Sequence, residues 1–209
     1  MNKKIVSMVA VSIILILCSA GQALTIVMDG TMHNGSFSGA SAGFWYNTPS
    51  AVPAGWTETA LYMYSTAAGW IQCGSTAEAI NNTGELVQAG HAYSLSAYLG
   101  GGAGVDATVR VYATQNVDGT GAKTLLAEIN RLGQSTDGYS LFNVSNTGSA
   151  AGASLDGYFV QVIIGGPYAY KGHYIGGYYD NITVTSELVP EPATLALLGI
   201  GGFFMRKRK

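Results

Sequence analysis

Five side chains suited to ligand binding lie close together between Gly165 and Gly177: Tyr168, Tyr170, Lys171, His173 and Tyr174. A tyrosine ring can stack on the apolar face of a sugar while its hydroxyl bonds to the edge of the sugar. Tyrosines on a β-sheet serve equally well in cross-strand packing, which is the alternative interpretation. Because this segment connects two predicted strands, where functional residues often lie, we expect it to be a ligand-binding loop.

Residue patterns of the common catalytic centres are absent from the sequence. The three histidines have no metal-binding spacing such as HExxH, and no GxSxG segment marks a nucleophilic serine. A glycoside hydrolase needs two carboxylates that face each other across a sugar. The scattered Glu58, Glu85 and Glu128 neither show nor exclude such a pair. We therefore expect that the protein is not an enzyme.

The C-terminal tail has the features of a protease substrate joined to a short membrane helix. Pro190 and Pro192 lack backbone N–H groups and favour extended geometry, so Pro190, Glu191 and Pro192 should be exposed and extended. The thirteen apolar residues 193–205 would span about 20 Å as a helix, less than the hydrocarbon core of about 30 Å. A basic cluster follows the apolar run: Arg206, Lys207, Arg208 and Lys209. These side chains can reach the membrane–water interface, and they predict a cytoplasmic C-terminus. A helix docked on the domain is the alternative, which three glycines and the lack of a polar face disfavour.

The N-terminus has the layout of a secretory signal peptide. Two lysines precede the apolar run 5–17, and small residues lead to a cleavage position after Ala23. We expect residues 1–23 to form a signal helix that engages the Sec translocon and is then removed. Cys18 could instead accept a lipid, but Leu17 stands where a lipoprotein signal has a small residue.

The body between these two ends, residues 24–187, is acidic. It contains four basic and eleven acidic side chains, which give a net charge of about −7. Without a basic stripe, nucleic acid is excluded as a partner. Cys73 is the only cysteine in this segment, so no disulfide can form within it. We expect a buried, inert thiol in a domain that is held together by its core.

Period-two alternation predicts that the body is all β. The segments 93–99 and 107–114 alternate most clearly, and the glycine-rich connection between them predicts a hairpin. The continuous apolar run 158–164 predicts a strand that is covered on both faces. Further strands are expected at 24–28, 60–64, 70–73, 84–88, 124–129, 139–144 and 179–185. Many short strands without a helical pattern predict an antiparallel β-sandwich.

Residues 188–209 resemble the PEP-CTERM sorting signal of Gram-negative bacteria in their Pro-Glu-Pro triplet, apolar run and basic end. The resemblance implies export through the inner membrane and transient anchoring there. It also implies cutting near the triplet by an exosortase, a membrane-embedded cysteine transpeptidase, and release to the cell surface or the extracellular matrix with its exopolysaccharide. The tail motif is also catalogued with ice-binding proteins, but the sequence shows no regular Thr-x-Thr array that would support ice as a ligand.

The body resembles galactose-binding-like jelly rolls of the carbohydrate-binding-module type. The resemblance rests on four segments: 26–30, 55–57, 86–98 and 179–184. It implies a structural Ca²⁺ between the first and last strands, with Asp29 and Asp180 in the matching stretches. His33 replaces the usual glutamate of the opening motif, and its imidazole nitrogen is a poor ligand for calcium. Alternatively, Asp29 heads a turn with Gly30, and Asp180 makes a hydrogen bond at a strand edge.

Together these patterns predict one β-sandwich domain, residues 24–187, between a signal peptide at 1–23 and a sorting segment at 188–209. The protein is expected to be secreted, sorted by an exosortase, and to bind carbohydrate or exopolysaccharide. The alternatives are a non-catalytic structural matrix protein and a weak glycoside hydrolase.

Overall fold

The computed structural model describes residues 24–37, 43–45, 53–58, 63–65, 71–73, 78–102, 104–134, 136, 140–165 and 177–190. Its strands are β1 (Thr25–Met28), β2 (Gly43–Trp45), β3 (Thr57–Glu58), β4 (Met63–Ser65), β5 (Ile71–Cys73), β6 (Glu78–Leu86), β7 (His91–Gly100), β8 (Asp106–Thr114), β9 (Lys123–Leu132), β10 (Phe142–Ala150), β11 (Phe159–Gly165) and β12 (Tyr178–Leu188). A short 3-10 helix, η2 (Ala153–Leu155), precedes β11. The predicted signal helix with Ala23, and the tail from Glu191 onward, lie outside these residues. Within them, no helix is long and apolar enough to cross a membrane.

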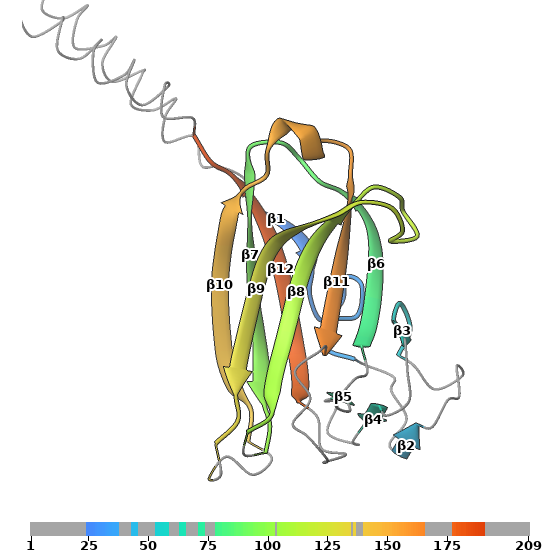
Figure 1. Ribbon diagram of the computed structural model, residues 1–209, viewed down its shortest axis with the longest axis vertical. Helices are drawn as coiled ribbons and strands as arrows, with labels where there is room; N and C mark the ends of the chain where they lie inside the picture. The colour runs from blue at the N-terminus through green and yellow to red at the C-terminus, as the bar shows by residue number, and fades with distance from the viewer. Residues whose placement is uncertain are drawn as a thin grey trace, which may run out of the picture.

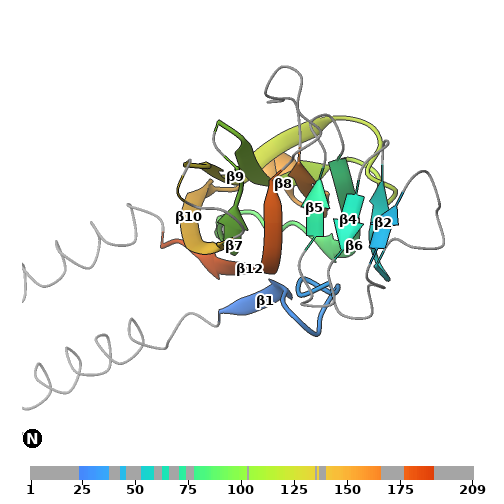
Figure 2. The ribbon, with the colours of Figure 1, turned by 90° about the horizontal axis from the view of Figure 1, so that it is seen from below.

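The strands form two sheets that pack face to face (Figures 1 and 2). The seven-stranded sheet has the order β10-β7-β12-β5-β4-β2, with β1 also paired to β12, and the five-stranded sheet has the order β3-β6-β11-β8-β9. Every strand pair is antiparallel. The predicted all-β, antiparallel sandwich is confirmed.

The predicted hairpin between 93–99 and 107–114 is wrong. β7 pairs with β10 and β12 in one sheet, whereas β8 pairs with β9 and β11 in the other. The alternation itself is confirmed, because Leu95 and Leu99 of β7 and Val109 and Val111 of β8 are all buried. These two apolar faces cover each other across the core, so the glycine-rich connection crosses between the sheets instead of closing a turn within one.

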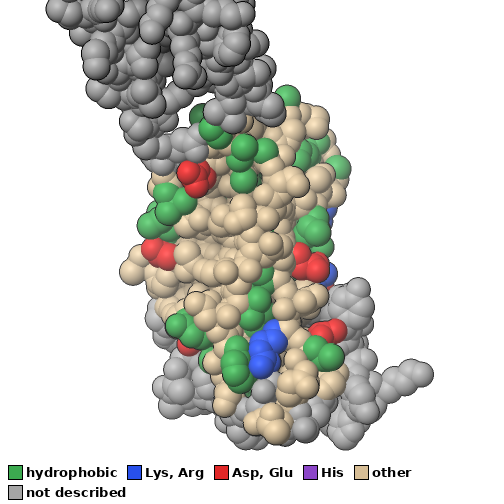
Figure 3. Space-filling view, turned by 90° about the vertical axis from the view of Figure 1, so that its left-hand side faces the viewer, with side chains coloured by type: hydrophobic (Ala, Val, Ile, Leu, Met, Phe, Trp, Pro, Cys, Tyr) green, Lys and Arg blue, Asp and Glu red, His purple; other side chains and the backbone are tan. Residues whose placement is uncertain are grey.

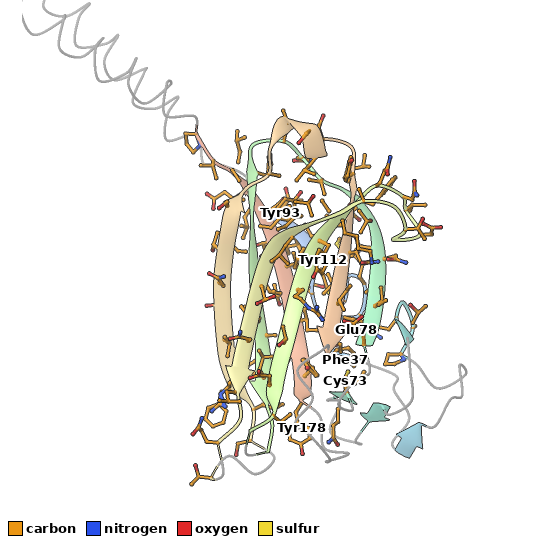
Figure 4. All side chains as sticks on the ribbon, viewed as in Figure 1. Phe37, Cys73, Glu78, Tyr93, Tyr112 and Tyr178 are labelled. Atoms are coloured by element: carbon orange, nitrogen blue, oxygen red, sulfur yellow. The ribbon has the colours of Figure 1, made fainter. Side chains whose placement is uncertain are left out.

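The core between the sheets is anchored by two buried tyrosines, Tyr179 and Tyr93, of which Figure 4 labels Tyr93. Each hydroxyl accepts a backbone N–H: that of Tyr93 from Gln88 at 3.1 Å, and that of Tyr179 from Thr108 at 3.1 Å. The bond from Thr108 of β8 to Tyr179 of β12 ties one sheet to the other. Burial raises the pKa of Tyr179 far above its usual range, so this hydroxyl stays neutral. Cys73 is buried, as predicted.

Strand positions depart from the sequence prediction where apolar alternation is weak. β11 has buried residues along nearly its whole length between β6 and β8, which confirms the doubly covered strand. The predicted strand 139–144 is found instead at β10, Phe142–Ala150, whose Ser, Thr, Asn and Gly residues are mostly exposed. The short strands β2 and β3 were not predicted, because three or two residues are too few to show a period.

Both ends of the body leave the sandwich at the same end (Figure 1). Thr25 at the start of β1 is aligned with Ser186 near the end of β12, and Leu188 is aligned with His91 at the start of β7. We name this the terminal end; it also carries the connections β6–β7, β8–β9 and β10–β11. The opposite, distal end carries the connections β7–β8, β9–β10 and β11–β12.

Candidate functional site

The outer face of the seven-stranded sheet carries a regular array of hydroxyl groups. Leu95 and Ala97 of β7 point into the core, so the alternate residues Ser94 and Ser96 point outward. Strand register extends each of them into a row across three strands: Thr147, Ser94 and Thr185 form one row, and Ser145, Ser96 and Thr183 form the other. The array therefore joins three segments that are distant in the sequence: β10 follows β7 by about fifty residues, and β12 follows β10 by about forty.

These six residues line a shallow groove of about 510 Å³, which Leu95 and Asn146 complete. Adjacent strands lie about 4.8 Å apart and alternate residues along a strand about 6.8 Å apart, so the hydroxyls form a nearly rectangular grid. Ser94 Oγ and Thr147 Oγ1 are 2.8 Å apart and share a hydrogen bond. No charged residue lines this groove, which we name the hydroxyl groove. The adjoining side of the molecule, where β10 lies, carries scattered acidic and basic side chains on a mostly uncharged surface (Figure 3).

A third row continues the array toward the distal end and adds an aromatic ring. Tyr98 lies two residues beyond Ser96 on the same face and is aligned with Asn143 and Asp180. Tyr98 is 41% exposed, so part of the residue is accessible to a ligand. A ring beside a grid of hydroxyls offers stacking and hydrogen bonding together, as neutral sugars require.

Asp180, a predicted metal ligand, is the acidic end of this third row. Its Oδ1 accepts the backbone N–H of Asn181 at 2.7 Å, and its Oδ2 accepts the Asn181 side-chain amide at 3.2 Å. Burial raises the pKa of Asp180, and the bond from the Asn181 backbone opposes that effect. This is the strand-edge hydrogen bond of the alternative interpretation.

Asp29, the other predicted metal ligand, heads a turn. Its Oδ1 accepts hydrogen bonds from Thr31 N, Thr31 Oγ1 and Met32 N at 2.6 to 2.8 Å, and these bonds lower its pKa. The residues that the structure describes include no group of three or more His, Cys, Asp or Glu that could hold a metal. Calcium takes six to eight oxygen ligands, and two carboxylates that each accept hydrogen bonds from their own segment do not fit that demand.

Hydrogen bonds within and around the turn 29–37 connect β1, β6 and β12 where an ion was predicted. Ile182 N donates to Gly35 O at 2.9 Å, and Asn81 Nδ2 donates to His33 O at 2.8 Å. The Phe37 ring packs against Trp56, with ring centroids 5.1 Å apart. The turn that follows β1 is therefore joined to β12 and β6 by hydrogen bonds, and to the segment 53–58 by aromatic packing.

The predicted ligand residues Tyr168, Tyr170, Lys171, His173 and Tyr174 lie outside the described residues, so their role stays a prediction. The structure does show how their segment is attached. Arg110 Nη2 donates to Gly165 O at 2.6 Å and to Glu78 Oε1 at 2.8 Å, at the distal end of the five-stranded sheet (Figure 4). This ion pair leaves no signal in the sequence, because Glu78 and Arg110 lie on different strands with no motif between them.

A family model of the PEP-CTERM protein-sorting motif matches residues 188–209. No curated protein sequence matches the chain.

Solved structures show similarity to the body. The Stig cyclase Fisc from Fischerella sp. TAU, in complex with (3Z)-3-(1-methyl-2-pyrrolidinylidene)-3H-indole, aligns with a TM-score of 0.54 at 13% identity, covering 80% of this chain and 100% of that one. An apo cyclase from Fischerella sp. aligns with a TM-score of 0.52 at 12% identity, covering 80% and 98%. The CBM22-1 xylan-binding domain of Paenibacillus barcinonensis Xyn10C aligns with a TM-score of 0.46 at 11% identity, covering 82% and 100%.

At such low identity, the likeness to the two cyclases concerns the fold alone. The motif at the C-terminus carries more specific information, because it indicates export and sorting to the cell surface or the extracellular space of a Gram-negative bacterium. Residues 188–209 are thus a PEP-CTERM protein-sorting motif, carried by an all-β, antiparallel sandwich.

Proposed function

We propose that this is a secreted, exosortase-sorted protein without catalytic activity, whose sandwich binds a neutral polysaccharide of the cell surface or matrix. The observation that carries the proposal is the hydroxyl groove with the exposed Tyr98 ring at its distal side. In this proposal the tail holds the protein at the inner membrane until the exosortase cuts near the Pro-Glu-Pro triplet. The β-sandwich then acts on the outside as a binding module.

The charge distribution supports a neutral ligand over an acidic one. A Ser or Thr hydroxyl can both donate and accept a hydrogen bond, so it matches sugar hydroxyls without a cost for burying charge. The body carries a net charge of about −7, which would repel a polysaccharide rich in carboxylates. Asp180 is the acidic residue of the third row and lies at the margin of the array. Burial raises its pKa, which means that burial disfavours the charged form of this carboxyl.

Affinity electrophoresis of the secreted protein tests the proposal. Gels that contain xylan, galactan or dextran should retard the protein, whereas gels with alginate, a polyuronate, should not. Tyr98→Ala should weaken binding about tenfold, because an aromatic platform contributes about 1.4 kcal/mol. The double variant Ser96→Ala/Thr183→Val should weaken it as well. Ser154→Ala, at an exposed hydroxyl in η2, is the matched control.

The possible outcomes separate the candidate functions. If no polysaccharide retards the protein, or if the groove variants bind as well as Ser154→Ala, the groove is not the binding site. Binding that is lost only in Tyr170→Ala would place the ligand at the β11–β12 connection instead. A complete lack of binding would favour a structural matrix protein, and release of reducing ends from any of the gel polysaccharides would identify a hydrolase.

A further inference from the structure

The Pro-Glu-Pro triplet of the sorting motif begins directly after the hydrogen bond that Val189 makes to the folded body. Val189 N donates to Gly90 O at 2.9 Å, and Pro190 is the next residue. The apolar run begins at residue 193, four residue steps beyond Val189. Because each step spans at most about 3.6 Å, Val189 and the start of the apolar run cannot be more than about 14 Å apart.

This short connection limits how far the body can lie from a membrane that holds the tail. Each headgroup layer of a bilayer is about 5 to 7 Å thick, as the difference between total and hydrocarbon thickness shows. If residue 193 lies at the hydrocarbon boundary, even a fully extended connection leaves Val189 within about 9 Å of the headgroup surface. The terminal end must then face the bilayer, because Val189 is bonded to it.

The exposed apolar side chains gather at this same end. Eleven large hydrophobic side chains are exposed in the described part of the protein. Seven of them lie in the terminal connections or in the adjoining strand ends: Leu24, Ile26, Leu86, Val117, Leu125, Leu188 and Val189. The terminal end therefore carries most of the large exposed apolar side chains in the described part of the protein, which a surface that contacts lipid requires.

Two acidic side chains in the terminal connections, Asp118 and Asp156, are hydrogen-bonded locally, while Glu187 near the end of β12 is exposed. Asp118 Oδ1 accepts hydrogen bonds from Thr120 N at 3.0 Å and from Thr120 Oγ1 at 2.7 Å. Asp156 Oδ1 accepts the N–H of Ala89 at 3.2 Å. Both carboxylates therefore stabilise turns of the terminal end. Contact with neutral lipid headgroups and the upper acyl chains satisfies the apolar side chains without pairing these charges.

We propose that the terminal end lies on the lipid surface while the tail is inserted, which holds the sandwich upright with its distal end away from the membrane. The inference rests on the membrane anchoring in the proposed function. In this orientation Tyr98 lies toward the end of the sandwich that points away from the membrane.

Fluorescence quenching on the full-length chain tests this orientation. Single cysteines are introduced by Val117→Cys at the terminal end and by Leu132→Cys at the distal end, two positions with matched exposures of 54% and 53%. Cys18→Ser removes the cysteine of the signal segment, and the native Cys73 is buried and stays unlabelled. Each labelled protein is mixed with phosphatidylcholine vesicles that carry a nitroxide on the headgroup. The label at residue 117 should be quenched at least threefold more strongly than the label at residue 132.

A flexible spacer provides the control. Insertion of twelve Gly and Ser residues between Val189 and Pro190 should remove most of the difference, because the body can then leave the surface. Flotation of the same vesicles reports separately whether the tail inserts. A chain that fails to float contradicts the anchoring itself. A chain that floats but shows equal quenching at residues 117 and 132 overturns the upright orientation and leaves anchoring and polysaccharide binding intact.

Discussion

Substitution of Gly35 by alanine should strongly destabilise the body, because Gly35 lies where β1, β12 and the turn 29–37 meet. A Cβ atom at this position would collide with Ile182 O and lie 2.8 Å from Asp29 O. Both obstacles are backbone atoms, so no side-chain rotation can relieve the contact. The substitution must therefore move the chain and disturb two hydrogen bonds, Gly35 N to Asp29 O at 2.7 Å and Ile182 N to Gly35 O at 2.9 Å.

The expected size of the effect follows from these contacts. Each lost backbone hydrogen bond costs about 1 kcal/mol. The displacement that makes room for a methyl group in a packed site adds about 1 kcal/mol or more. The free energy of unfolding should thus fall by about 3 kcal/mol, which corresponds to a midpoint lower by about 6 to 12 °C for a domain of this length.

Thermal unfolding followed by circular dichroism measures this effect. Gly152→Ala is the matched control, since its Cβ would have only Ser154 Oγ nearby, at 3.8 Å, and its φ of −68° suits alanine. The control should change the midpoint by no more than about 2 °C. If Gly35→Ala unfolds at the same temperature as Gly152→Ala, the turn 29–37 does not join the first and last strands as described.

Three further predictions concern the metal, the pH and the tail. Millimolar calcium added to chelated protein should leave the unfolding midpoint unchanged, because the Asp29 carboxylate is bonded to its own turn; a clear rise would restore the calcium site. Asp180→Asn should stabilise the protein at pH 7 in urea titrations. Burial raises the pKa of the Asp180 carboxyl in the folded protein above its ordinary value of 3.8. The carboxyl therefore contributes stability below pH 3.8, and this contribution is lost as the pH rises through the folded-state pKa. If the Asp180→Asn variant keeps the pH dependence of the wild type, Asp180 is not the cause. Glu191→Ala should leave secretion across the inner membrane intact but trap the full-length protein at that membrane. If mass spectrometry shows that the mature wild-type chain still ends at Lys209, sorting by cleavage is refuted.

Sequence alone could predict the fold class, because burial leaves a direct mark on residue order. Wherever one face of a strand meets the core, apolar residues recur with period two, as in β7 and β8. The pattern records which residues face inward but not which strand lies alongside. β7 and β8 were therefore predicted correctly as strands and paired wrongly, since local alternation is the same whether a connection closes a hairpin or crosses the core.

The calcium prediction shows a different limit. Asp29 and Asp180 were paired by resemblance, yet each carboxylate bonds to residues one to three positions further along the chain. Such local bonds compete with any ion for the same oxygen atoms. Only the observed donors at Thr31, Met32 and Asn181 could show that these oxygens were already engaged.

The hydroxyl groove was out of reach of sequence analysis for a physical reason. Its members are small polar residues that occur in pairs, Ser94 and Ser96 on β7 or Thr183 and Thr185 on β12, and each pair alone reads as the solvent face of a strand. Nothing in such a pair indicates a ligand, and Thr183 with Thr185 is a single Thr-x-Thr pair that does not make a regular array. The array exists only through register, which places three pairs from distant segments side by side. The lack of charge on β10 has two consequences. A charged edge strand would have been easier to recognise in the sequence as solvent-exposed. The uncharged strand is better suited to bind a neutral polymer, because no charge has to be buried against the ligand.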